Sequence, residues 1–409
     1  MRSIVAAAVV SLFASLALGC VPDPRLHPVA VSTGLVAWGA AVVMLMGKAE
    51  GVDRPGVAVP SRVLEVRCFS WALVALVVVA TAVRAPFLAW PPTLSDDAHR
   101  YVWEGRVWLA GHSPFALAPD ASELVALRDA NWALVNHKSV ASVYPPLAQA
   151  LFVGLAPFGV VGVKLFMGLT DVVTAVVLWR RERRLGWLWA LLPLPVVESA
   201  ANGHLEAAGA LLVALALAGS DLAAWLGMML KLLPGVFLVR RPPWVWVVAG
   251  LAAALAAWPV VGVGALAGLR NYGAHWSFNG SVYPLITMVF GERDGRLLLF
   301  IVGALVSVWA LATRRDRASL GLWVFGAFVV LSPTVHPWYV LWPLVPALWR
   351  GERAWLWLAA LAPLSYLVLS TADQAGTWHE VWWVRIVEYG PFFLILLRDA
   401  WRRFSWAGP

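Results

Sequence analysis

The stretch FSWALVALVVVATAVRAPFLAW, residues 69–90, has one charged side chain, Arg84, in a run that is otherwise apolar or small. A helix of this length crosses about 30 Å, the thickness of the hydrocarbon core of a bilayer. Similar runs recur along the chain, in which 61% of residues are hydrophobic and 13% are charged. Soluble domains carry roughly 25% charged residues. The sequence therefore predicts an all-α, polytopic membrane protein.

The apolar runs predict about twelve transmembrane helices in one membrane domain over residues 1–409. Residues 1–20 are similar to a signal segment, but Leu18 stands where cleavage requires a small residue, so we expect an uncleaved first span. The expected spans are 3–20, 29–47, 69–90, 162–179, 186–201, 204–219, 243–266, 297–313, 319–334, 337–349, 354–371 and 386–400.

The basic residues between the spans predict the orientation of the chain. Cytoplasmic loops are enriched in Lys and Arg, so we expect these clusters, and with them both termini, in the cytoplasm. This topology accounts for the net charge of +8 without a nucleic-acid partner. It also places Cys20 and Cys68 on opposite sides of the membrane, so that they should not pair. The clusters lie at 48–67, 180–184, 240–241, 314–317, 350–353 and 398–403.

Two apolar segments are expected not to cross the membrane. Residues 147–160 are too short for a span and contain Pro157, so we expect a helix that lies at the outer surface or re-enters. Residues 221–239 must return to the side where they begin if the next basic cluster is cytoplasmic. The break Lys231-Leu-Leu-Pro234 near the middle of this segment predicts a re-entrant hairpin that lines a protein cavity.

The longest polar stretch between spans is 91–146, and residues 91–160 are expected to form an outer-face catalytic loop with juxtamembrane helices. It contains SDDAHRYVWEGRVWLAGHSPF, residues 95–115, which gathers several charges beside aromatic side chains. Ser95 is expected to cap a helix over 96–110.

Helical spacing arranges the charges of this helix in two adjoining stripes. Asp96 lies four residues before Arg100, and Asp97 lies four residues before Tyr101 and seven before Glu104. Acidic side chains in a first turn also compensate the helix dipole, which remains an alternative explanation. Ionisable residues that face inward at a membrane boundary are functional candidates.

Three more outward segments carry polar residues amid apolar sequence: VESAANGHLE (197–206), RNYGAHWSFNGSVYP (270–284) and SPTVHPWY (332–339). His204 and Glu206 lie at the outer end of the sixth expected span, where a hydrated turn would also explain them. His336 lies between two prolines and could belong to an interfacial aromatic belt. Lys231 could extend its ammonium to the membrane surface. These structural alternatives stay open.

Glycosyl transfer fits this combination of residues. A carboxylate can take the proton of an acceptor hydroxyl, and the reaction passes through an oxocarbenium-like transition state. Cationic side chains can stabilise a lipid-phosphate leaving group, and aromatic rings offer faces for a sugar. The sequence has no P-loop, HExxH, Gly-x-Ser-x-Gly or Cys/His zinc pattern. Kinase and metalloprotease chemistry is therefore unsupported.

Over roughly residues 84–345 the chain resembles the GT-C superfamily of integral membrane glycosyltransferases, and within it the bacterial polyprenyl-phosphate-mannose-dependent mannosyltransferases. The motifs that carry the resemblance are SDDAHRYVWEGRVWLAGHSPF, YPPLAQALF (144–152), NGHLEA, LKLLP and HPWYVLWPL. The first two spans look like an addition to the pattern of this family. Glu206 stands where the relatives commonly have Asp, which leaves its role open.

The resemblance implies an inverting transfer of a sugar, most plausibly mannose, from a polyprenyl-phosphate donor on the outer face. It assigns the role of catalytic base to Asp96, with Asp97 as the close second candidate. It also implies that juxtamembrane helices begin at Tyr144. Arg100, Lys231 and His336 are expected at the donor phosphate, and Tyr101, Trp103 and Trp338 at the sugar or the prenyl chain. The full set of expected substrate contacts is Arg100, Tyr101, Glu104, Tyr144, His204, Glu206, Lys231, His336 and Trp338.

Several alternatives remain at this level. The acceptor can be a glycan, a lipid or a protein, and no cofactor is certain. A divalent metal is possible, but adjacent carboxylates point about 100° apart on a helix, so Asp96 and Asp97 would need another segment to chelate one ion. A secondary transporter or lipid flippase with a charged outer gate is the second functional hypothesis, and inverted repeats typical of transporters are not seen. A structural subunit of the cell envelope is the third.

Overall fold

The computed structural model describes residues 1–46, 70–92, 94–239, 276–371 and 378–405, together with isolated positions between 240 and 275. In these ranges the chain is helical, and the only extended pairing is a pair of isolated bridges from Phe278 and Asn279 to Thr334. The all-α class is confirmed. The expected span 243–266, Cys68, His275 and the basic clusters at 48–67 and 240–241 lie outside the described residues.

Six helical stretches of the described residues are long and apolar enough to cross a membrane. They are Arg2–Gly19 (α1), Pro28–Met46 (α2), Trp71–Leu88 (α3), Pro146–Arg181 (α6 to α7), Tyr283–Thr313 (α14) and Arg353–Ser370 (α17 and η7). Shorter apolar helices are Glu206–Leu217 (α10), Asp221–Leu230 (α11) and Arg317–Leu331 (α15). The membrane-helix character is thus confirmed, whereas the expected number of spans is not.

Several segments that were expected to be single α-helices consist of more than one helical element. The expected span 186–201 is interrupted at Leu192, which is extended because Pro193 follows it. It consists of α8 (Arg183–Leu191), α9 (Pro193–Val196) and a π-helical turn, η4 (Val197–Ala201). Likewise 337–349 divides into η6 (Pro337–Val340) and α16 (Leu341–Arg350), and 354–371 into α17 (Arg353–Leu361) and η7 (Ala362–Ser370). The last helix, α18, covers Trp382–Ser405.

The break predicted at Lys231 is present, and residues 147–160 are separated from the following helix by a short 3₁₀ stretch. Helix α6 (Pro146–Leu155) is separated from α7 (Gly159–Arg181) by η3 (Ala156–Phe158), and Gly159 takes a left-handed φ of 61°. Helix α11 ends at Leu230, and Lys231 is extended before η5 (Leu233–Leu238). The chain can therefore change direction on either side of both segments.

Buried charges hold the apolar bundle together. The Arg84 guanidinium of α3 forms an ion pair with Asp171 of α7 and also donates to the carbonyls of Ala80 and Ala190. Asp171 accepts a second hydrogen bond from Trp189 Nε1 at 2.6 Å. A buried ion pair is tolerated in such surroundings when its remaining donors and acceptors are satisfied, as they are here.

A second buried cation fixes the end of α3. Lys164 of α7 donates to the carbonyls of Phe87 at 2.9 Å, Leu88 at 3.0 Å and Trp90. Carbonyls at a helix C-terminus have no partner within the helix. The Lys164 ammonium supplies one, and so sets the point at which the chain leaves the bundle for the polar loop.

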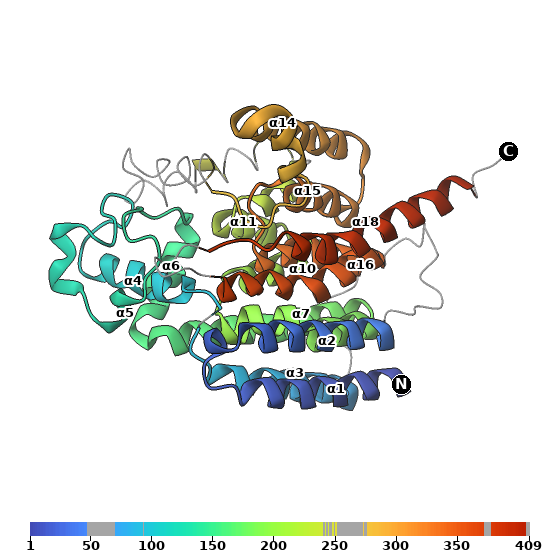
Figure 1. Cartoon of the computed structure of the whole chain (residues 1–409), viewed down its shortest axis with the longest axis horizontal. Coiled ribbons are helices and arrows are strands. Elements are labelled where there is room, and N and C mark those ends of the chain that lie inside the picture. The colour runs from blue at the N-terminus through green and yellow to red at the C-terminus, as the bar shows by residue number, and fades with distance from the viewer. Residues whose placement is uncertain are drawn as a thin grey trace.

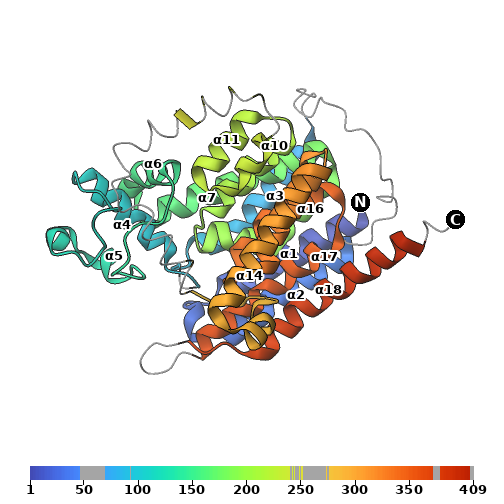
Figure 2. The same cartoon turned by 90° about the horizontal axis from the view of Figure 1, so that it is seen from above.

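The polar loop forms a cap at one end of the bundle, where α4 (Asp97–Leu109), η2 (Ser122–Leu127), α5 (Ala130–Ala133) and α6 cluster (Figures 1 and 2). Gly105 lets α4 and α6 approach closely, because a Cβ there would lie 2.2 Å from the carbonyl oxygen of Phe152.

Helix α4 begins near its expected start, but its N-cap is Asp96 and not Ser95. Ser95 Oγ instead accepts the backbone N–H of Asp97 at 3.3 Å.

Candidate active site

Asp97 lies at the first turn of α4, where the cap meets the bundle. Its Oδ1 accepts a hydrogen bond from Asn136 Nδ2 at 2.8 Å, and its Oδ2 lies 3.9 Å from His204 Nε2. Burial raises the pKa of Asp97, but the proximity of His204, the hydrogen bond from Asn136 and the ammonium of Lys231 outweigh it and hold the pKa below its usual range. Asp97 is therefore an ionised carboxylate in partly buried surroundings.

Asp96 has different neighbours. Burial raises its pKa, and the nearest opposing charges are Arg25 of the α1–α2 connection and His99. Arg25 follows Pro24 in the short helix η1 (Pro24–Leu26). Asp97, rather than Asp96, is therefore the carboxylate that faces His204 and Lys231.

His204 follows the π-helical turn η4 and is fully buried. Gly203 before it takes a φ of 70°, and a Cβ there would lie 3.2 Å from a methyl of Val163, so the NGH turn requires glycine. His204 Nδ1 lies 2.7 Å from Glu198 Oε2, and Nε2 lies 2.9 Å from Ser95 Oγ. The ring thus joins the start of α10 to the start of α4.

Lys231 and Glu206 form an ion pair near Asp97. Glu206 opens α10 and is fully buried, whereas the Lys231 side chain at the end of α11 is 25% exposed. The Lys231 ammonium also lies over the rings of Tyr144 at 5.9 Å and Tyr339 at 5.6 Å. Within the described residues the second Glu206 oxygen, Oε2, has no hydrogen-bond partner. The site therefore holds one accessible cation beside an incompletely bonded carboxylate.

Stacked rings form one wall of the site. Trp338 stacks on His204 at 3.8 Å and on His336 at 4.3 Å, and His336 stacks on Phe278 at 5.0 Å. Trp338 is only 8% exposed. Trp338 is expected to pack against sugar or prenyl chain, and in this structure its indole stacks on the two histidines.

The surroundings of His336 favour the neutral form of its imidazole. Burial lowers the pKa of its imidazole to about 3, although Asp97 opposes the shift. In the part of the chain that the structure describes, its ring nitrogens make no hydrogen bond. A neutral ring in this position can donate a hydrogen bond to a phosphate oxygen, but it does not bring the positive charge that the sequence suggested.

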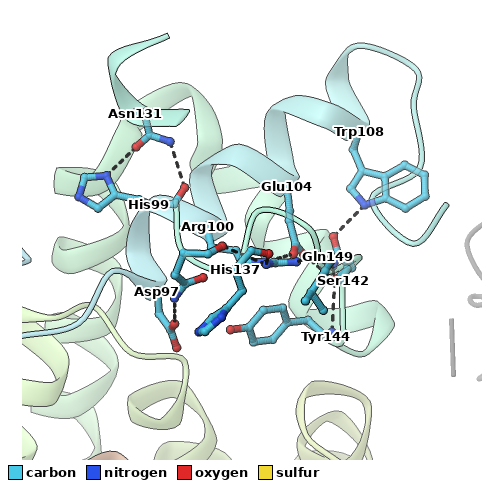
Figure 3. A network of polar contacts seen from close by, with 12 residues as sticks. Asp97, His99, Arg100, Glu104, Trp108, Asn131, His137, Ser142, Tyr144 and Gln149 are labelled. Atoms are coloured by element: carbon cyan, nitrogen blue, oxygen red, sulfur yellow. Dashed lines mark hydrogen bonds and ion pairs between the residues drawn. The ribbon is translucent and has the colours of Figure 1, made fainter. Parts of the chain in front are cut away.

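Arg100 and Glu104 are bound within the cap (Figure 3). Arg100 donates to Glu104 Oε1 at 2.8 Å and to the carbonyls of Asn136, His137 and Val140. Glu104 Oε2 accepts from Ser142 and Gln149, both at 2.6 Å. Arg100 thus orders the loop that carries Asn136.

Two aromatic residues of α4, Tyr101 and Trp103, are buried. Tyr101 is buried between Phe152, on which it stacks at 4.5 Å, and Tyr144, which meets it edge-on at 5.3 Å. Trp103 is buried in a separate cluster inside the cap. Tyr144 lies closer to the site, and Figure 3 shows its hydroxyl, the His137 ring and the Asp97 carboxylate directed into the same space.

A groove of about 310 Å³ lies between α6 and α11, with Trp108 of α4 also in its wall. Its lining is mainly apolar and includes Leu147, Val153, Leu226 and Met229. The same two helices place Tyr144 and Lys231 at one end: Tyr144 precedes α6, and Lys231 follows α11. The apolar groove thus lies between the two helices whose ends carry Tyr144 and Lys231.

Sequence reasoning missed three residues that shape the site. Asn136 lies 39 residues from Asp97, and Tyr366 lies 168 residues from Glu198, so no local pattern connects them. Glu198 was noted beside His204 but was not included in the site; a carboxylate in an apolar helix was the available signal. No group of three or more His, Cys, Asp or Glu side chains in the described ranges is arranged to hold a metal ion.

Comparison with models of known protein families, with curated proteins and with solved structures found no match to this chain.

Proposed function

We propose that this protein is a membrane glycosyltransferase that moves a sugar from a polyprenyl-phosphate donor to an acceptor hydroxyl. One observation carries the proposal: the ionised Asp97 and the ammonium of Lys231 face one site, and an apolar groove lies between α6 and α11, the helices that adjoin Tyr144 and Lys231 in the chain. A carboxylate base, a cation for a phosphate and a place for a hydrocarbon chain are the parts that this reaction requires.

In the proposed reaction, Asp97 takes the proton of the acceptor hydroxyl. The hydroxyl oxygen then forms a bond to the anomeric carbon as the bond from that carbon to the donor phosphate breaks. The leaving polyprenyl phosphate keeps the electron pair, and Lys231 stabilises its charge. His336 donates a neutral hydrogen bond to the same phosphate, and the groove between α6 and α11 holds the first part of the prenyl chain.

The remaining details of the proposal follow from the resemblance and from the positive-inside rule. The sugar is mannose, the configuration at its anomeric carbon is inverted, and the cap lies on the extracytoplasmic face with both termini in the cytoplasm. This face suits a lipid-linked donor, because the bilayer delivers it without a nucleotide-binding site. The acceptor is a glycan, a lipid or a protein.

Purified protein in liposomes tests the function. Polyprenyl phosphates labelled in the sugar, with mannose, glucose or arabinose as the sugar, are supplied with envelope glycolipid and glycan acceptors. Transfer of label from one donor supports the enzyme and identifies the sugar. Net movement of the intact lipid across the bilayer without product supports a carrier instead and contradicts the proposal. Mass spectrometry of envelope lipids and glycans, with and without the gene, identifies the acceptor.

We expect His336→Ala to lower kcat/KM for the donor by roughly ten- to hundredfold, because a hydrogen bond to a charged group contributes about 1.5–3 kcal/mol. His336→Gln keeps a neutral donor and should lose less. Kinetics at varied donor concentration, together with thermal unfolding in detergent, provide the measurement. If Ala, Gln and Tyr at this position all give wild-type donor kinetics, His336 belongs only to the aromatic wall.

A further inference from the structure

The contacts of Glu198 set it apart from the other buried carboxylates. Its Oε2 lies 2.7 Å from His204 Nδ1 and accepts from Asn202 Nδ2 at 3.0 Å, while Oε1 accepts from the Tyr366 hydroxyl at 2.7 Å. The Glu198 carbonyl also accepts the backbone N–H of His204 at 2.7 Å. Glu198, Asn202 and His204 are all essentially inaccessible to solvent. Every one of these contacts restrains the position of one imidazole.

The chemistry of the pair decides the tautomer of His204. An ionised carboxylate only accepts hydrogen bonds, so Nδ1 of His204 must carry a proton to bond with Glu198. In the neutral ring Nε2 is then the acceptor, and it lies 2.9 Å from Ser95 Oγ. Ser95 Oγ in turn accepts the backbone N–H of Asp97. The orientation imposed by Glu198 is therefore transmitted to the first turn of α4.

The backbone around Glu198 also restrains the His204 ring. Glu198 lies in a π-helical turn, a conformation that is rare and is frequently found at functional sites. Its end is followed by the left-handed Gly203, which turns the chain so that His204 points back at Glu198. The indole of Trp338 stacks on the face of the His204 ring. The imidazole is thus held by a hydrogen bond, a turn and a stacked indole.

We infer that Glu198 is a positioning residue of the active site: by holding His204 with Nδ1 protonated, it directs Nε2 to accept from the Ser95 hydroxyl, whose Oγ accepts the backbone N–H of Asp97, and so fixes the first turn of α4. This inference builds on the proposed function, since it assigns no contact between Glu198 and substrate. A second carboxylate beyond a histidine is a common means of setting the tautomer and orientation of the ring.

The first test does not depend on catalysis. Protein labelled with ¹⁵N and ¹³C in histidine is studied by NMR in nanodiscs, and the His204 signals are assigned by their loss in His204→Gln. In the wild type, His204 is expected to be protonated on Nδ1, and in Glu198→Ala this tautomer should lose its dominance. Glu388→Ala is the matched control, because Glu388 is equally buried but bonds to Asn279. It should leave the His204 signals unchanged.

The second test measures whether Glu198 acts through His204. We expect Glu198→Ala to lower kcat about tenfold with little change in KM for the donor, a coupling within the range for residues in direct contact. In a His204→Ala background the same substitution should cause almost no additional loss. Residues that act through one another give such non-additive effects, whereas independent structural damage adds up.

The outcomes separate the inference from the function on which it rests. If no sugar is transferred by any variant, the proposed function fails, but the NMR experiment still decides the role of Glu198. A wild-type His204 protonated on Nε2 alone would overturn the inference without any substitution, so it does not depend on the folding of a variant. Additive losses in the double variant would also overturn it.

Discussion

Replacing Asp97 by Asn is expected to lower the rate of sugar transfer by at least about 10²-fold, the lower end of the range for general-base catalysis. Asparagine keeps the shape of the side chain and can still bond to Asn136, but it cannot take a proton. The structure should therefore persist while turnover falls. Single-turnover kinetics with a labelled donor measure the loss, and thermal unfolding in detergent verifies the fold.

Asp96→Asn is the matched control, and it distinguishes the two adjacent carboxylates. The resemblance favoured Asp96, whereas the contacts of Asp97 with Asn136 and its proximity to His204 favour Asp97. We expect Asp96→Asn to retain most of the activity. Near-normal turnover of Asp97→Asn with loss in Asp96→Asn would return the role to Asp96.

The pH dependence supports the same distinction. A carboxylate acts as a base only when it is ionised. Its contribution to the rate is therefore present above its pKa and disappears as the pH falls below that pKa. The pKa of Asp97 is held below the ordinary value of 3.8 and that of Asp96 is raised above it. With Asp97 as the base, kcat/KM should stay constant on the acid side of its pH profile until the pH falls below 3.8. If kcat/KM instead begins to fall above pH 3.8, and this fall disappears in Asp96→Asn, the base is Asp96.

The class of fold could be predicted from composition, because a chain this apolar must satisfy its backbone within helices when it lies in a membrane. The run Lys231-Leu-Leu-Pro234 also revealed the break at Lys231. The number of spans could not be predicted in the same way. Hydropathy does not report where Pro193 interrupts a run, or whether a short apolar helix crosses the bilayer or packs within the protein.

The site was predictable only where the signal was local. Asp97, His204, Glu206, Lys231 and His336 stood out as ionisable groups in apolar surroundings, and the structure gathers them at one end of the bundle. The direction of each side chain was not predictable, since it depends on distant partners. Arg100 illustrates this: its carbonyl partners lie 36 to 40 residues away, and they bind it within the cap.

Lys231→Met is expected to affect both donor use and stability. Loss of a charge-assisted hydrogen bond to the donor phosphate should lower kcat/KM roughly ten- to hundredfold. The substitution also leaves the buried Glu206 carboxylate without its counter-charge. Breaking a buried pair costs about 3–5 kcal/mol, and because Lys231 is a quarter exposed we expect about 3 kcal/mol, the lower end. Donor kinetics and urea or thermal unfolding in detergent measure the two effects.

The double variant Lys231→Met with Glu206→Gln separates these effects. Gln removes the uncompensated charge, so much of the lost stability should return, whereas the cation for the phosphate is still absent and donor use should stay low. Arg106→Met is a control in the same cap: its pair with Asp129 is exposed, and exposed pairs contribute little. If the double variant recovered donor use together with stability, Lys231 would serve only to neutralise Glu206. The donor phosphate would then be bound by His336 and by groups other than Lys231, because Arg100 is already bound within the cap.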